Sequence, residues 1–356
     1  MSWFLAFAGF ALLIMLHEGG HFLAAKAVGM RVERFSLFFP PFLVRKKIGE
    51  TEYAIGAIPL GGYVKISGMN PDQDLPEEVR DRAYHAQPVW KRMMVIAAGP
   101  AVNIVLAFVL LFLFYTLVGP VDSKVGKIDP TYPAAKVLEP GDRIIAVDGH
   151  KGGPATIAAQ IATHACAEKP PKPRCTAKTP ARLLVERGGR RIELLVTPVY
   201  DPRVKRVRVG FSYSDARRPL AAGDAASHTT DQLWFITKET VKLPARLLDS
   251  KKRKEVSSVV GGYEVTRQTI LANTGDVLGV LAIISLSLAI INLFPFLPLD
   301  GGHIFWAAVE KVRRRPVPLS VMERASVIGF LLVIGVFLIG LSNDIDRLSG
   351  EGFQVR

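Results

Sequence analysis

Cysteine is scarce in this sequence. Its 356 residues include only Cys166 and Cys175, and neither belongs to a CxxC pattern. A CxxC-type metal or redox motif is therefore excluded. The two cysteines lie close together in a proline-rich stretch, so they form either a disulfide, if this region is exported, or two free thiols.

A nucleic-acid-binding pattern is also missing, although the net charge is +13. The basic residues neither form a recognition helix nor alternate with aromatic side chains. Many of them stand just outside apolar runs, namely at Arg45-Lys46-Lys47, Lys91-Arg92 and Arg313-Arg314-Arg315. We interpret them as topology signals and lipid-headgroup contacts, and we expect the lipid bilayer, with no nucleic acid, as a partner.

Long apolar runs are what the sequence does have. Hydrophobic residues make up 49% of the chain and charged residues 22%, which indicates apolar spans separated by polar domains. Four segments are apolar enough to span a bilayer, at about 3–28, 93–118, 277–299 and 327–341. No Lys or Arg precedes Lys26, so the first run lacks the basic start of a cleaved signal peptide.

The basic residues predict the orientation of these spans. The segment 31–92 and the loop after the third span are short and rich in Lys and Arg, so both should be cytoplasmic. The stretch from about 119 to 276 is also basic, but long exported domains largely escape this rule. The first and third spans are therefore expected to run parallel, with their C-terminal ends at the cytoplasmic side.

The motif HEGGH at 17–21 lies inside the first span. On a helix, His17 and His21 are one turn apart and share a face, so both imidazoles can bind one zinc ion. Glu18 then lies near the open side of the metal, where it can take a proton from the attacking water and pass it to the leaving amine. Three ionisable groups within a span are costly and indicate a compensating metal.

Zinc in a catalytic site needs a third protein ligand. The third span ends in INLFPFLPLDGGH (291–303), and Asp300 lies at the cytoplasmic end of a span parallel to the first. Asp300 is therefore the expected ligand, and His303 is the competing candidate. The remaining histidines, His85, His150, His164 and His228, lie in loops or in the exported region.

Helix-breaking residues precede Asp300. Pro295 and Pro298 interrupt the helix, and Gly301 with its neighbouring glycine allows a tight turn. Irregular backbone at membrane depth persists only where it lines a cavity or is covered by protein, which suits a water-containing site. Asn292 could bind the backbone of an extended substrate or make a polar contact between helices.

Taken together, four motifs resemble the site-2 protease family. They are HEGGH, IPLGGYVKISG (58–68), AAGPAVN (97–103) and NLFPFLPLDGGH (292–303). Their order and the exported insert resemble the bacterial branch with a PDZ domain, and 133–149 (PAAKVLEPGDRIIAVDG) resembles a PDZ sequence. The resemblance covers nearly the whole chain.

This resemblance implies a role for each matching residue. It assigns one Zn²⁺ per chain to His17, His21 and Asp300, with Glu18 as the catalytic base and Asn292 as a substrate contact. It implies that Gly61 and Gly62 belong to a membrane-associated β element beside the cleft. It places Gly99, Pro100 and Asn103 in a second-span signature whose role is helix packing or catalysis.

The expected fold is a polytopic α-helical membrane protein with about four transmembrane helices, a membrane-associated β-hairpin and an inserted extracytoplasmic PDZ-like α/β domain. The expected division is a first catalytic half at 1–118 with the β element at 51–68, the PDZ-like domain at 122–200, a connector at 201–276, a second catalytic half at 277–343 and a tail at 344–356.

The expected activity is intramembrane proteolysis by a zinc metalloendopeptidase of the cytoplasmic membrane, with the active site toward the cytoplasm. Its partners would be single-span membrane proteins, such as anti-sigma factors or remnant signal peptides. An upstream site-1-type protease would trim them first, and the exported domain would act as a size filter. The alternative is a non-catalytic membrane scaffold whose PDZ-like domain binds exported peptides.

Overall fold

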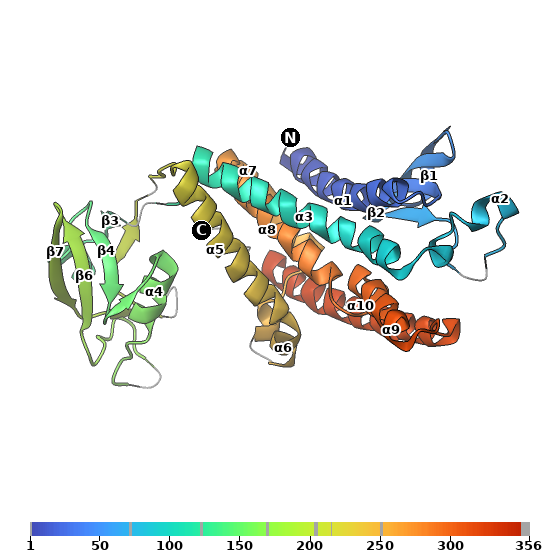
Figure 1. Ribbon diagram of the computed structural model, residues 1–356. Coiled ribbons are helices and arrows are strands. Elements are labelled where there is room, and N and C mark those ends of the chain that lie inside the picture. The colour runs from blue at the N-terminus through green and yellow to red at the C-terminus, as the bar shows by residue number, and fades with distance from the viewer. Residues whose placement is uncertain are drawn as a thin grey trace. The chain divides into compact units, whose positions relative to one another are not determined.

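The computed structural model describes residues 2–70, 73–121, 124–168, 171–202, 206–214, 216–249 and 252–349 (Figure 1). The chain divides into two compact units. A helical unit contains the chain up to Leu117 and from Ala221 onward, and a β-rich unit spans Val118–Leu220.

The helical unit contains every helix that is long and apolar enough to cross a membrane in the described residues. Its helices are α1 (Ser2–Ala27), α2 (Glu77–Arg80), α3 (Val89–Leu117), α5 (Ala222–Val241), α6 (Leu243–Leu248), α7 (Val259–Ala272), α8 (Val277–Asn292), α9 (Asp300–Arg313) and α10 (Leu319–Ser349). The four candidate spans are α1, α3, α8 with the short turn before it, and α10. This confirms a polytopic helical protein.

The span limits differ from expectation at the C-terminal side. Helix α8 ends at Asn292 instead of Leu299, because Pro295 and Pro298 cannot continue a helical hydrogen-bond ladder. Helix α10 begins at Leu319 and extends to Ser349, well beyond the apolar run at 327–341. Polar residues at both ends of α10 lie outside the apolar run, so hydropathy does not indicate these extra turns.

Helix α3 is the centre of the helical unit and packs against α1, α5, α8 and α9 (Figure 1). The contact with α1 is close, because a Cβ at Gly20 would lie 2.6 Å from the carbonyl oxygen of Ala98. On its other side, Ala107 of α3 shares a buried cluster with Leu286 of α8 and Ile236 of α5. Two helices with zinc-site motifs, α1 and α9, are thus both held by α3.

Two long strands, β1 (Val32–Ile48) and β2 (Thr51–Ile66), pair beside α1. The first part of β1 contacts both parts of β2, since Leu37 pairs with Gly62 and with Ile55. The last part of β1 returns to pair with 51–56. The segment 62–66 therefore forms an outer edge of this sheet.

The expected hairpin within 51–68 is not what forms. Residues 51–66 make one strand whose partner is β1, and the glycines do not form its turn. Gly56 instead permits a close approach of the Phe39 backbone, where any Cβ would collide. A glycine within a strand often marks such a place, where another backbone comes close.

Helix α7 forms hydrogen bonds with the N-terminal end of α1 and the C-terminal part of α10, which are two of the candidate spans. At one side, the Tyr263 hydroxyl donates a hydrogen bond to the Trp3 carbonyl in α1, at 2.9 Å. At the other, Asp344 of α10 accepts a hydrogen bond from the backbone N–H of Gly261, also at 2.9 Å. These ends of α1 and α10 therefore lie on the same side of the helical unit, as the predicted orientation requires.

The β-rich unit contains β3 (Val125–Ile128), β4 (Arg143–Val147), β5 (His150–Lys151), α4 (Pro154–Ala162), β6 (Ala181–Arg187), β7 (Arg190–Val196), β8 (Val199–Asp201), β9 (Arg206–Arg208) and β10 (Phe211–Tyr213). Its main sheet has the antiparallel order β5-β4-β6-β7, and α4 packs on β4 and β5. Alternating apolar side chains of β4 and β6 fill the core beneath α4.

This unit is longer than the domain expected at 122–200. Strand β10 pairs with β3, which adds 201–220 to the unit. The rest of the expected connector, from Ala222 onward, is mostly helical, and α5 packs against α3 and α8. Strands of three residues carry too little alternation to be recognised from sequence.

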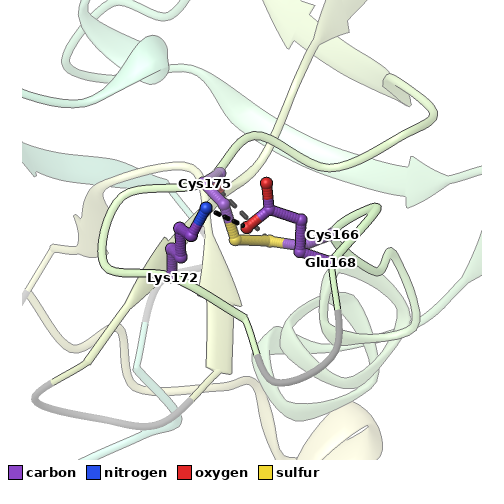
Figure 2. Close-up of a disulfide and its surroundings, with 4 residues drawn as sticks. All are labelled: Cys166, Glu168, Lys172 and Cys175. Carbon is purple, nitrogen blue, oxygen red and sulfur yellow. Dashed lines mark hydrogen bonds and ion pairs between the residues drawn. A yellow bond between two sulfur atoms is a disulfide. The ribbon is translucent and has the colours of Figure 1, made fainter.

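Cys166 and Cys175 form a disulfide in the β-rich unit (Figure 2). The bridge closes a short loop across which Lys172 and Glu168 form an ion pair at 3.0 Å. The loop is attached to β8, because the Tyr200 N–H donates to the Cys175 carbonyl at 2.9 Å. Of the two alternatives, the structure selects the disulfide.

Candidate metal centre

Helix α1 presents His17 and His21 on one face. The helix forms because its sequence is rich in Leu, Ala, Phe and Ile, with the polar motif at its C-terminal half. Residues four apart lie one above the other, so the two imidazoles meet. Both are buried, with 6% and 7% of their surface exposed, and their Nε2 atoms are 3.3 Å apart.

Asp300 reaches the same point from the first turn of α9. Its Oδ2 lies 3.2 Å from His17 Nε2 and 3.3 Å from His21 Nε2. The three ligand atoms lie within 4.8 Å of one another, although 283 positions separate His17 from Asp300 in the chain. The structure thus brings together all three residues that the sequence predicted as ligands.

These separations match a zinc coordination shell. Zinc bonds of about 2.0–2.2 Å at a tetrahedral angle place two ligand atoms about 3.3 Å apart. The donor set of two imidazoles and one carboxylate is one that zinc prefers, and it leaves the fourth position for water. The residues therefore fit one zinc ion.

The tautomer of His21 supports the same conclusion. Its Nδ1 lies 2.9 Å from the carbonyl oxygen of Val95 in α3, so Nδ1 carries the proton. Its Nε2 then presents a lone pair toward Asp300. Zinc-binding histidines almost always donate their other N–H in this way, which fixes the ring for the metal.

Gly99 of α3 makes room for this ring. A Cβ at position 99 would collide with the His21 imidazole at Nε2. Position 99 therefore requires glycine, because any side chain would displace the His21 ring. Gly20, the other close contact between α1 and α3, lies inside the HEGGH motif itself.

Asn292 lies at the last turn of α8, beside the histidines. Its Nδ2 is 3.5 Å from His17 Nε2, so the side chain borders the metal position. This contact joins α8 to α1 and also brings the side chain to the site, so it agrees with both roles left open by the sequence. The loop with Pro295 and Pro298 follows directly and leads to Asp300.

The expected tight turn at Gly301 is absent from the structure. Gly301 and Gly302 instead belong to the first turn of α9. A Cβ at Gly301 would collide with the Leu293 carbonyl, and one at Gly302 with the Leu297 backbone nitrogen. These glycines allow the start of α9, and hence Asp300, to lie directly against the proline loop.

Glu18 lies next to the edge of the β1–β2 sheet. A Cβ at Gly62 would be 2.8 Å from Glu18 Cγ and 2.9 Å from the Ser36 carbonyl oxygen. Gly61 contacts the Phe39 ring instead, at 3.0 Å from the same kind of added Cβ. The predicted general base and the predicted substrate-binding strand are therefore in contact.

Pro100 and Asn103 lie in the buried part of α3. The Asn103 carbonyl accepts a hydrogen bond from the Ser285 hydroxyl of α8 at 2.9 Å, so this turn is part of helix packing. The Asn103 side-chain amide is fully buried and finds no hydrogen-bond partner within the described residues. His303 lies on α9 but is not part of the converging group.

Sequence reasoning missed the Val95 carbonyl as the partner of His21. A backbone carbonyl leaves no mark in the residue type, because every residue has one. The close approach at Gly20 could have been found, since both middle positions of HEGGH are glycines. Glycine destabilises the middle of a helix, so the pair indicates a close approach, and Gly20 is the one that makes it.

Comparisons with known proteins agree with this geometry. Residues 5–336 match the family model described as Peptidase family M50. A protein of Brucella suis named "Putative zinc metalloprotease" is 33% identical, over 94% of this chain and 92% of the relative. Relatives of the same name from a Nostoc species and from Clostridium perfringens are 30% and 27% identical, over 95% and 96% of this chain and 95% and 97% of their own length.

Proposed function

Because the chain belongs to peptidase family M50, the site-2 protease family, and is therefore a metalloprotease, we propose that it cleaves peptide bonds in or near membrane-spanning segments. One observation carries the proposal. His17, His21 and Asp300 converge at zinc-ligand spacing inside a helical unit with four candidate membrane spans.

The residues of the site divide the chemistry between them. His17, His21 and Asp300 would hold zinc, which when bound polarises a water molecule and the scissile carbonyl. Glu18 is adjacent in α1 and lies against Gly62 at the edge of the sheet. It would take the proton of the attacking water and deliver it to the leaving amine nitrogen.

The edge segment 62–66 would hold the substrate. A peptide bond inside a helix is shielded by its own hydrogen bonds, so a substrate helix has to unwind before cleavage. An outer strand segment can pair with an extended peptide through main-chain hydrogen bonds. Gly62 lies against Glu18, so a peptide added there would bring its backbone beside the general base, and Asn292 could bind it from α8.

The proposed setting is the cytoplasmic membrane, with the site toward the cytoplasm. Two features support it. The basic segment 31–92 leads into the helix that carries Val95 and Gly99, next to the metal centre. The disulfide lies in the β-rich unit, and such bonds persist mainly in exported regions.

For the β-rich unit we propose a PDZ-like role as a size filter that admits substrates already trimmed by another protease. Its four-stranded sheet covered by α4 is compatible with such a module. Replacing 118–220 by a flexible linker should then permit cleavage of untrimmed single-span proteins. Unchanged selectivity in a folded, zinc-loaded variant would contradict this role.

The central test uses Glu18→Gln in protein reconstituted into lipid vesicles with a single-span substrate. Loss of the general base should lower cleavage by about 100-fold or more, while zinc content stays at the wild-type level. His85→Gln, at a histidine outside the centre, is the control and should cleave normally. Cleavage by Glu18→Gln at the wild-type rate would exclude the mechanism, and wild type that binds substrate without cleaving it would favour the scaffold.

A further inference from the structure

Helix α3 carries none of the three ligands, yet it contacts both helices that do. Val95 and Gly99 orient His21, as described above. One turn before Val95, Arg92 forms a two-point contact with Glu310 of α9, at 3.0 Å and 2.5 Å. Arg92, Val95 and Gly99 are spaced by three and four residues, so they lie on one face of α3.

The position of Glu310 on α9 is informative. Asp300, Ile304, Ala307 and Glu310 follow one another at spacings of four, three and three, which places them along one stripe of the helix. Ile304 packs against the buried cluster that contains Val95, and Ala307 is buried. The stripe that begins with the carboxylate ligand thus ends in the ion pair, about 15 Å further along the axis.

Two contacts, one near each end of α9, add to its packing against α3. At its start, Gly301 and Gly302 lie against the proline loop, which fixes one point of the helix. A helix fixed only at its start could still rotate about its axis and tilt. The contact with Arg92 near the other end removes that freedom and links the direction of α9 to the helix that orients His21.

The environment of the pair makes it more than a surface contact. The side chains of Arg92 and Glu310 are 12% and 26% exposed. The Arg92 guanidinium lies 5.8 Å from the centre of the Tyr84 ring, which belongs to the same buried cluster as Val95. A planar guanidinium that binds a carboxylate at two points sets a geometry as well as supplying charge.

We propose that Arg92 and Glu310 are a positioning pair for the metal centre, which holds α9 so that Asp300 meets His17 and His21 at zinc-binding distance. The inference rests on the proposed function, because it requires zinc at these ligands. Neither residue touches the metal position or the substrate. The pair acts through the α9 backbone, and metal sites tolerate only about 0.5 Å of ligand displacement.

The experiment measures how fast zinc leaves the full-length protein when an excess of chelator is added. Glu310→Gln keeps the shape of the side chain and removes its charge. We expect zinc release to become about 10–100 times faster, as for other groups that orient metal ligands. Exchanging the partners, with Arg92→Glu and Glu310→Arg together, should bring release back to within about 3-fold of wild type.

Glu50→Gln is the matched control. Glu50 lies at the turn between β1 and β2 and also binds an arginine at two points, with both Arg82 contacts at 2.8 Å. Hydrogen bonds from Arg82 and then Lys26 hold the pKa of Glu50 at about 2, so it is charged at neutral pH. In the described part of the chain its polar contacts are with Arg82 and Lys26, so its loss should leave zinc release unchanged.

The outcomes separate the two proposals. Wild-type protein that holds no zinc would overturn the proposed function. Wild type that holds zinc, with Glu310→Gln releasing it at the wild-type rate, would overturn the positioning pair alone. Equal acceleration in Glu310→Gln and Glu50→Gln would also overturn it, because general loosening of the fold would then explain both. Thermal unfolding of each variant confirms that folded protein is compared.

Discussion

Two carboxylates of the helical unit are buried in opposite kinds of surroundings. Asp344 in α10 is fully buried and faces donors: the hydroxyls of Ser257 and Ser258 and the N–H groups of Ser258 and Gly261, all at 2.6–2.9 Å. Asp300 in α9 faces two imidazole nitrogens, of which His21 Nε2 presents a lone pair.

The difference separates a structural carboxylate from a functional one. A buried carboxylate that accepts several hydrogen bonds is compensated where it stands, and here it caps the start of α7. A buried carboxylate beside an imidazole lone pair is compensated there only when a cation is added, either a metal ion or a proton on the ring. Judged by burial alone, Asp344 would be the stronger candidate for a functional carboxylate. The hydrogen-bond partners show that Asp300 is the functional one.

The largest expected effect is at Asp300. Asp300→Asn keeps the shape but replaces a charged ligand by a poor one, so zinc retention and proteolysis should fall by about 1000-fold or more, beyond the usual loss for groups outside the ligand shell. The free energy of unfolding of the metal-free protein should change by no more than about 1 kcal/mol, because this carboxylate contributes little to stability without the ion. Zinc analysis and thermal unfolding of the metal-free protein check both parts.

A fall in metal-free stability as large as that at Asp344 would erase the contrast between the two residues. His164→Gln, in the β-rich unit, is a control that should leave zinc retention intact.

A smaller effect, of the opposite kind, is expected at Asp344. Asp344→Ala leaves the hydroxyls and N–H groups around α7 without their acceptor, so unfolding should become easier by about 2–4 kcal/mol. The zinc content of each folded chain should not change. Denaturant titration in detergent measures the first quantity and metal analysis of the folded fraction the second.

Asp346→Ala is the matched control, since Asp346 is exposed and lies two residues further along the same helix. If Asp344→Ala lost its zinc while remaining as stable as Asp346→Ala, the structural assignment of Asp344 would be wrong.

The two histidine ligands are predicted from the sequence because their spacing is local, whereas Asp300 is predicted from the orientation of the third span. His17 and His21 need only a helix to meet, whereas Asp300 reaches them from α9, which follows the third span and the proline loop. The Asp344 cap could not be found in this way, because its partners lie about 85 positions away and include backbone N–H groups. Local patterns identify residues that act through their own element, and packing identifies the rest.

The same limit explains the errors in the fold. The sequence predicts a β element at 51–68 but not its partner strand at 32–48, which contains Pro40 and Pro41. The polar, threonine-containing sequence of α5 predicts a connector, but the segment forms a helix that packs on α3 and α8. In each case the missing information was which surface covers the segment.

Zinc-edge X-ray absorption on the purified full-length protein tests the central claim most directly. The account predicts one zinc per chain with two imidazole nitrogens and one carboxylate oxygen at about 2.0–2.2 Å, and no sulfur neighbour, because both cysteines are paired in the disulfide. A spectrum without imidazole scattering, or one that Asp300→Asn and His17→Ala leave unchanged, would contradict it.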